Sequence, residues 1–177
     1  GQHLNRHQIP CGYIGKWHLD GGDYFGFGIC PEGWEPEYWY DMKCYLEELS
    51  PKDRIRSRNP TTAYEPDFDQ GFTYAHRCSD RALRFLEQYQ DQDFFLTVSY
   101  DEPHGPSLCP EPYRSMYDGF SFEDHPGFHD DLGDKPKMQQ LWAGENRNSD
   151  PEKLRGPSKE LSLFLGCNSF VDYEIGR

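Results

Sequence analysis

The stretch Gly12-Tyr13-Ile14-Gly15-Lys16-Trp17-His18-Leu19 is the starting point for predicting the fold and the site. Residues 9–14 form a short apolar run that favours an extended strand. In an extended chain residues i and i+2 point to the same side, so Lys16 and His18 face one pocket and Trp17 packs the other way. A fixed ammonium offsets negative charge, and an imidazole moves a proton near neutral pH. The pair therefore suits an anionic ester.

A second strand and two long helices are predicted further along the chain. Residues 94–100 include Phe95, Leu96 and Val98, as in a strand buried on both faces of a parallel sheet. A helix is predicted over about 72–89 and a last one over about 158–177. The apolar residues that recur at helical spacing in the first are Phe72, Ala75, Ala82, Leu83, Leu86 and Tyr89. This order predicts an α/β fold with a mostly parallel sheet sandwiched by helices.

Two further segments lack a clear pattern. Residues 20–66 are loop-rich because glycine and proline recur along them, with one short helix near 38–49. Residues 118–157 are acidic and rich in Gly and Pro, which indicates a long insertion. His125 and His129 lie there four residues apart, but the Pro and Gly between them argue against a helical metal site.

Candidate site residues follow both predicted strands directly. Lys16 and His18 follow the first strand, and His104 follows the second. In open α/β sheets ligands bind beyond the carboxyl ends of the strands. We therefore expect these three side chains at one edge of the sheet.

Composition excludes several classes of partner. The formal net charge of −13 argues against nucleic acid, which requires clustered Lys and Arg, and against an anionic membrane surface. No apolar run approaches the roughly 20 residues needed to span a bilayer. An anionic substrate would need a local cationic pocket, which Lys16, His18 and His104 supply.

The six cysteines do not form a C-x-x-C motif and are too few for a disulfide-dense scaffold. We expect mostly free, partly buried thiols, with Cys11 and Cys78 in the core. Disulfides among Cys30, Cys44 and Cys109 are the alternative if the protein is exported.

Three stretches together resemble the sulfatase family of the alkaline-phosphatase-like superfamily. Residues 12–19 match its G-Y-x-x-G-K-x-H signature, residues 94–106 resemble its strand and P-H-x-P-type loop, and residues 170–177 resemble its D-x-x-I-G-R helix. The resemblance implies an incomplete alkaline-phosphatase-like α/β fold. It also implies hydrolysis of a sulfate monoester, carried by a small molecule or a carbohydrate, to an alcohol and inorganic sulfate.

The resemblance also implies roles for individual residues. Lys16 would bind the sulfate and stabilise the nucleophile, and His18 would act as the base on a formylglycine hydrate. His104 would hold the sulfate or aid departure of the alcohol oxygen. The family's cofactors would be formylglycine and one divalent cation, which we expect to be Ca²⁺.

Parts of the family pattern have no counterpart in this sequence. No cysteine stands in the C-x-P/A-x-R motif that yields formylglycine, and Cys109 comes nearest. The acidic motifs that hold the metal have no counterpart either. The sequence is therefore expected to be an internal segment, with residues 1–177 as part of a sulfatase catalytic domain that is inactive alone. The cofactor ligands would lie outside it.

Three acidic residues are further candidates for contacts with substrate. Asp101 and Glu102 stand before Pro103 where the family usually has a small residue, so they would contribute to substrate choice. An equal alternative is that they cap a loop or bond to backbone. Asp20 is a candidate too, although an Asp beside Gly21 is typical of a turn.

Two other functions stay open at this point. One is a phosphonate or phosphate ester hydrolase of the same superfamily, which the missing nucleophile segment would distinguish. The other is a non-catalytic carbohydrate-binding segment that uses the aromatic side chains between residues 24 and 45, although such a cluster is more often a small core under a loop. The sequence does not indicate a compartment.

Overall fold

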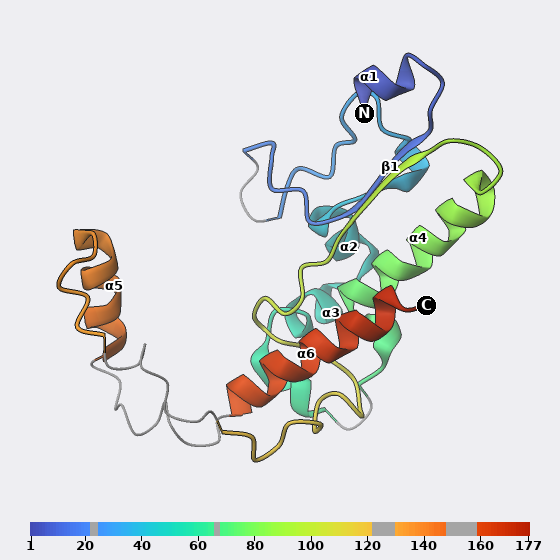
Figure 1. Cartoon of the computed structure of the whole chain (residues 1–177). Coiled ribbons are helices and arrows are strands. Elements are labelled where there is room, and N and C mark those ends of the chain that lie inside the picture. The colour runs from blue at the N-terminus through green and yellow to red at the C-terminus, as the bar shows by residue number, and fades with distance from the viewer. Residues whose placement is uncertain (22–24, 66–67, 122–129, 148–158) are drawn as a thin grey trace.

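The structure is a computed structural model, and it describes residues 1–21, 25–65, 68–121, 130–147 and 159–177. Three parallel strands form its sheet in the order β2-β1-β3 (Figure 1). They are β1 (Cys11–Gly15), β2 (Trp39–Tyr40) and β3 (Phe95–Ser99). The expected α/β fold with a parallel sheet and helices is confirmed.

Helices occupy much of the remaining described chain. The α-helices are α1 (Gln2–Asn5), α2 (Met42–Glu48), α3 (Pro51–Arg56), α4 (Tyr74–Tyr89), α5 (Lys137–Arg147) and α6 (Lys159–Ile175). The short 3₁₀ helices are η1 (Pro36–Tyr38), η2 (Pro60–Tyr64) and η3 (Gln70–Phe72). None of the helices in the described ranges is both long enough and apolar enough to cross a bilayer.

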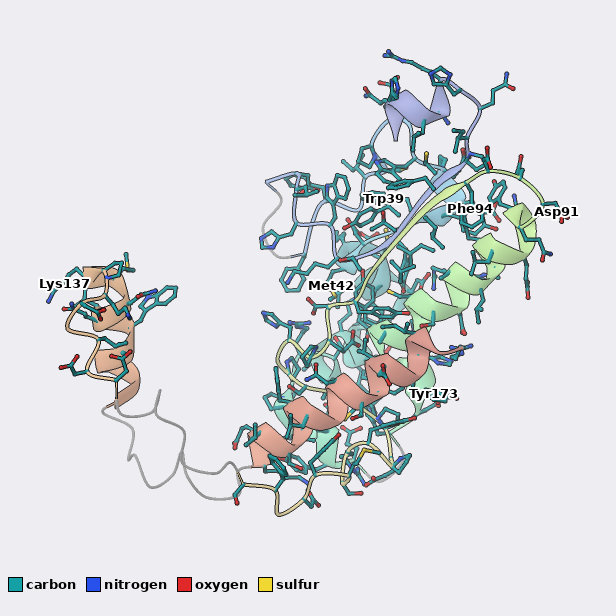
Figure 2. All side chains as sticks on the ribbon, in the orientation of Figure 1. Trp39, Met42, Asp91, Phe94, Lys137 and Tyr173 are labelled. Carbon is teal, nitrogen blue, oxygen red and sulfur yellow. The ribbon has the colours of Figure 1, made fainter. Side chains whose placement is uncertain are left out.

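Helix α4 covers one face of the sheet. Thr73 begins it as N-cap, since its side chain accepts a hydrogen bond from the His76 amide at 3.2 Å. Phe85 and Ile14 are fully buried in the core between α4 and β1. A side chain at Gly12 would overlap the Phe85 ring, so this glycine lets the helix approach the strand closely. Figure 2 shows side chains filling this space, while Lys137 and the rest of α5 lie apart from it.

Aromatic side chains cover the opposite face of the sheet. The Tyr13 ring centroid lies 4.7 Å from that of Trp17, 5.4 Å from that of Trp34 and 5.6 Å from that of Trp39. These distances are typical of edge-to-face and tilted aromatic pairs. Tyr38, Tyr40 and Tyr45 are buried on the α4 side, in the same core as Ile14 and Phe85. The burial of these residues and of Trp39 favours the core interpretation of the aromatic stretch.

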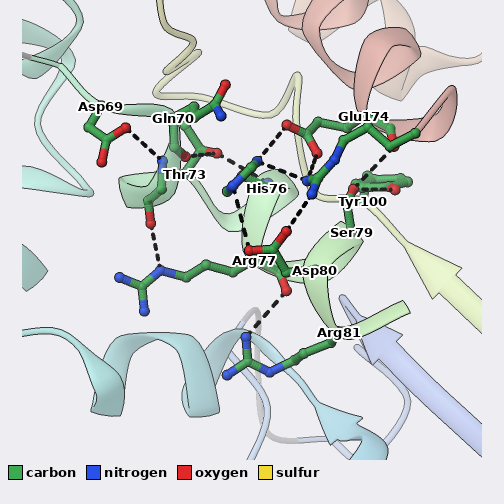
Figure 3. Close-up of polar contacts among 12 residues, drawn as sticks. Asp69, Gln70, Thr73, His76, Arg77, Ser79, Asp80, Arg81, Tyr100 and Glu174 are labelled. Atoms are coloured by element: carbon green, nitrogen blue, oxygen red, sulfur yellow. Dashed lines mark hydrogen bonds and ion pairs between the residues drawn. The ribbon is translucent and has the colours of Figure 1, made fainter. Parts of the chain in front are cut away.

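Helix α6 packs on α4 and is joined to it by polar contacts (Figure 3). The buried Glu174 carboxylate lies 2.8 Å from His76 Nδ1 and accepts a hydrogen bond from Arg177 at 2.8 Å. Arg177 also donates to Asp80 at 2.6 Å. Polar side chains of α4 are thus bound to side chains at the end of α6, far away in the sequence.

The predicted helices and strands mostly agree with the structure in position. The prediction that the second strand is buried on both faces is wrong, because no residue of β3 is fully buried and Phe95 is 42% exposed. The helix expected near 38–49 is the shorter α2, and the last helix begins at Lys159 within the described residues. Helices α3 and α5 were not predicted, because they lie in segments that Pro and Gly residues interrupt. His125 and His129 lie outside the described residues. All six cysteines are free, and four are buried.

Candidate active site

The site is built where β1 and β3 end side by side. Gly15 is in register with Ser99, and the Lys16 amide donates a hydrogen bond to the Ser99 carbonyl at 2.8 Å. The segments that carry Lys16 and His104 therefore leave the sheet at the same edge. This is the arrangement that the positions after the two predicted strands indicated.

Gly15 allows this close approach. Its φ of +119° is a conformation that side chains rarely adopt, and an added Cβ would lie 2.0 Å from the Ser99 carbonyl oxygen. Any other residue would push the two strand ends apart. The glycine of the signature is therefore a requirement of the backbone at this edge.

Lys16 is held in an ion pair with Asp101. The Lys16 Nζ lies 3.0 Å from Asp101 Oδ1, and the two side chains are 21% and 7% exposed. The positive charge of Lys16 therefore compensates the negative charge of the nearly buried Asp101 carboxylate. An ammonium has three N–H donors, so it can contact a carboxylate oxygen and an anion at the same time.

Tyr13 in β1 and Trp17 in the following turn hold that turn in place. The Tyr13 hydroxyl donates to the Lys16 carbonyl at 2.6 Å, and Trp17 packs on Tyr13 and Trp39. His18 is exposed and has φ of +51°. Left-handed backbone at a residue other than glycine is uncommon and costs about 1–2 kcal/mol. Such strained positions cluster at functional sites, and here the surrounding turn holds it.

His104 lies on the turn that follows β3. Its amide donates to the Asp101 carbonyl at 2.9 Å, which closes the turn, and its side chain is exposed. Its Nδ1 is 2.9 Å from the Gly105 carbonyl oxygen. A ring nitrogen bound to a carbonyl carries the proton, so Nε2 is the acceptor in the neutral ring.

Glu102 turns away from Lys16 and into the protein. Its Oε1 accepts a hydrogen bond from the Ala75 amide in the first turn of α4 at 2.9 Å, where a carboxylate is favoured. Its Oε2 is buried and has no hydrogen-bond partner among the described residues. Burial raises the pKa of Glu102 to about 7. Backbone bonding was the alternative interpretation of this residue, and the Ala75 contact matches it.

Asp20 organises the loop that follows the signature. Its Oδ2 accepts a hydrogen bond from the Phe27 amide at 3.2 Å. The buried Asp41 supports the same loop, accepting from the Gly28 amide at 2.9 Å. These contacts are those of a turn-forming aspartate, and a contact of Asp20 with substrate stays a prediction.

A small cavity adds a residue that the sequence did not single out. It has a volume of about 30 Å³, enough for about one water molecule, and is lined by Arg58, Tyr45, Thr73, Asp101, Glu102 and His104. Arg58 lies just after α3, and its guanidinium is 5.5 Å from the centroid of the Phe25 ring. No spacing or motif links this arginine to His104, because only the fold brings them to one cavity.

The described residues do not fit the cofactors that the sequence resemblance implies. No group of three or more His, Cys, Asp or Glu side chains in those ranges is arranged to hold a metal ion. Cys109 is fully buried behind the His104 turn, so it does not open onto the site. A role of Lys16, His18 and His104 in binding an anion and moving a proton stays a prediction.

The chain is similar to known proteins over most of its length. The model of a family described as Sulfatase matches residues 1–177. The chain is 43% identical over 173 residues to the "Uncharacterized sulfatase YidJ" of Escherichia coli (strain K12), a match that covers 93% of this chain and 34% of the relative. It is 35% identical over 174 residues to a "Sulfatase" of Formosa agariphila, covering 92% and 32%. The chain thus spans about a third of the length of these relatives.

Proposed function

Because this chain belongs to the sulfatase family, we propose that it forms part of the active site of an enzyme that hydrolyses a sulfate monoester to an alcohol and inorganic sulfate. The observation that supports the proposal is that β1 and β3 end side by side, so the segments that carry Lys16 and His104 leave the sheet at one edge. A sulfate group needs cationic donors, and leaving-group chemistry needs a proton.

Lys16 binds the sulfate oxygens in this proposal. Its ammonium donates charge-assisted hydrogen bonds to the anion as negative charge shifts during ester cleavage. Asp101 acts as a positioning residue, because its carboxylate fixes the Lys16 ammonium at 3.0 Å. Contact of Asp101 with a cationic part of the substrate is the further role that the sequence suggested.

The two histidines divide the proton transfers. His18 takes up a proton as the base, and its exposed imidazole in the turn after Lys16 leaves it accessible for this role. His104 turns its Nε2 toward the ester, since Nδ1 is engaged near the Gly105 carbonyl. When Nε2 is also protonated, it donates a hydrogen bond to a sulfate oxygen or delivers its proton to the alcohol oxygen that leaves.

The family generally uses formylglycine and a divalent cation, and these belong to other parts of a longer protein in this proposal. Ca²⁺ is the cation we propose, and residues 1–177 are part of the catalytic domain. We therefore expect this segment to be inactive alone. The substrate is a small-molecule or carbohydrate sulfate ester, with Asp20 and Glu102 as candidate contacts to its alcohol part.

The test uses the full-length protein that carries this segment. Sulfate release would be measured from an aryl sulfate, and phosphate release from the aryl phosphate of the same phenol. We expect sulfate release, with kcat/KM lowered about 10²–10³-fold in each of Lys16→Ala, His18→Ala and His104→Ala. Preference for the phosphate ester would favour the superfamily alternative.

Matched controls separate a lost catalytic group from a misfolded protein. Lys52→Ala and His7→Ala remove the same residue types at exposed positions away from the site, and we expect unchanged kcat/KM. Sulfate release that survives all three site substitutions would reject the proposal. Sugar binding that survives them without any hydrolysis would favour the carbohydrate-binding alternative.

A further inference from the structure

Two of the six cysteines share one buried cluster although they lie far apart in sequence. Cys109 follows the His104 turn, and Cys167 lies in the middle of α6. Both are 0% exposed, and they pack with Ala75 and Phe170. The cluster therefore joins the segment after β3 to α6 through a pair of thiols.

A glycine brings the two segments together. A Cβ added at Gly166, the residue before Cys167, would lie 2.3 Å from the Tyr113 carbonyl oxygen and 3.4 Å from Cys109 Sγ. The backbone of α6 thus approaches residues 109–113 as closely as the absence of a side chain permits. Hydrogen bonding to Cys109 raises the pKa of the Cys167 thiol, and burial raises that pKa further.

Other cysteines in the chain direct their thiols at the backbone. The Cys11 Sγ lies 3.3 Å from the Ile9 carbonyl oxygen, and the Cys30 Sγ lies 3.5 Å from the Trp34 carbonyl oxygen. The contact between Cys109 and Cys167 thus differs in kind, since each thiol has another thiol as neighbour.

We propose that Cys109 and Cys167 form a disulfide that fastens the segment after the His104 turn to α6 when the protein folds in the presence of a small-molecule disulfide. One cysteine thiolate attacks the oxidant's S–S bond, forms a mixed disulfide and releases one thiolate. The second cysteine then attacks the protein sulfur of that mixed disulfide and releases the other thiolate. The two cysteines lose two protons and two electrons in total, and the oxidant is reduced to two thiols.

The burial of the pair sets when this exchange takes place. The thiolate is the reactive form, and the raised pKa of Cys167 makes it scarce in the folded protein. The bond therefore forms while the chain is still folding. Once the cluster has closed, both sulfurs are shielded from solvent and from reductants.

The sequence allows a direct peptide map of the bond. The full-length protein would be refolded with oxidised and reduced glutathione, denatured, alkylated without reduction and digested with trypsin. Lys and Arg residues separate all six cysteines into different tryptic peptides, with Cys109 in 85–114 and Cys167 in 160–177. We expect these two peptides as one cross-linked species, lighter by two hydrogens than their sum, and the other four cysteines alkylated.

A second readout tests whether the bond fastens the fold. The Tm of the oxidised protein should exceed that of the same sample after it has been reduced in denaturant and refolded with reductant present. This difference should vanish in the Cys109→Ala/Cys167→Ala double variant and persist in Cys78→Ala, which removes another fully buried thiol. Alkylation of all six cysteines, linkage of Cys109 to another peptide, or a wild-type Tm that reduction does not change would each overturn the proposal. The wild-type map and Tm decide the question even if a variant does not fold.

Discussion

At the scale of single residues, Gly15 joins the sheet to the candidate site. Its positive φ and the nearby Ser99 carbonyl leave no room for a side chain. Gly15→Ala should lower the free energy of unfolding by about 1–3 kcal/mol, the usual cost of a strained backbone position. Denaturant titration would measure this.

Gly105 provides the matched control for that substitution. It lies beside His104, but a Cβ added there meets nothing within 4 Å and its φ is not positive. Gly105→Ala should therefore change stability by less than about 0.5 kcal/mol, as most open surface substitutions do. Equal losses for the two variants would contradict the role assigned to Gly15.

Glu102 predicts a pH dependence of stability at the same scale. Burial raises its pKa from 4.5 to about 7 in the folded state. Below about pH 4.5 both states are protonated. Between 4.5 and 7 the unfolded state ionises first, so stability falls as the pH rises and then levels off above 7. The full cost is at most about 3 kcal/mol, since one pKa unit corresponds to about 1.4 kcal/mol.

The isosteric variant Glu102→Gln isolates this effect. Its side chain keeps an oxygen for the Ala75 amide but cannot ionise. Relative to wild type, the variant should gain stability from pH 5 to pH 8 in denaturant titrations. The exposed Glu47→Gln should show no such gain. A Glu102→Gln difference that stays constant over this range would mean that Glu102 keeps an ordinary pKa.

At the scale of elements, α4 shows how far sequence periodicity reaches. The pattern predicted this helix over nearly its observed length, but it favoured Leu86 as a core residue and omitted Phe85. In the structure Phe85 is fully buried and Leu86 is 38% exposed. Both β1 and α6 pack on α4. The buried face of α4 is therefore wider than the face that a single apolar stripe indicates, and it is rotated about the helix axis relative to that face.

Phe85→Ala tests this assignment of the buried face. Removing a fully buried phenylalanine should lower the free energy of unfolding by about 3–5 kcal/mol. Leu86→Ala should cost clearly less, because part of that side chain stays in water. Chemical denaturation of the two variants compares them directly, and a larger loss for Leu86→Ala would mean that α4 is rotated from its observed orientation.

Only the part of the candidate site that depends on the order of strands along the chain could be predicted from the sequence. The segments of Lys16 and His104 each follow a strand, so the common edge at which they leave the sheet could be inferred from the strand pattern alone. The ion pair of Lys16 with Asp101 could not be inferred from the sequence, and neither could the position of Arg58 in the lining of the cavity. Those contacts depend on the relative placement of separate loops, for which a sequence spacing contains no signal.

At the scale of the whole molecule, the two long helices are joined by a charged cluster whose members differ in burial. The Glu174 side chain is 0% exposed and contacts both His76 and Arg177, whereas the Asp80 side chain is 47% exposed. Arg177 forms an ion pair with each of the two carboxylates, Glu174 and Asp80. The cluster fixes α6 on α4, and α4 in turn contacts the residue that follows β3, since the Ser79 hydroxyl is 2.8 Å from the Tyr100 hydroxyl.

The difference in burial predicts unequal effects of two matched substitutions. Glu174→Gln should lower the free energy of unfolding by about 3 kcal/mol, because it leaves the Arg177 and His76 groups without their buried countercharge. Asp80→Asn should cost less than about 1 kcal/mol, since water screens a half-exposed pair. Denaturant titration gives both values, and hydrogen exchange should show the loss of protection along α6 in Glu174→Gln alone. Equal effects of the two variants would mean that the cluster acts as a surface ion pair and that apolar packing around Phe170 holds the helices together.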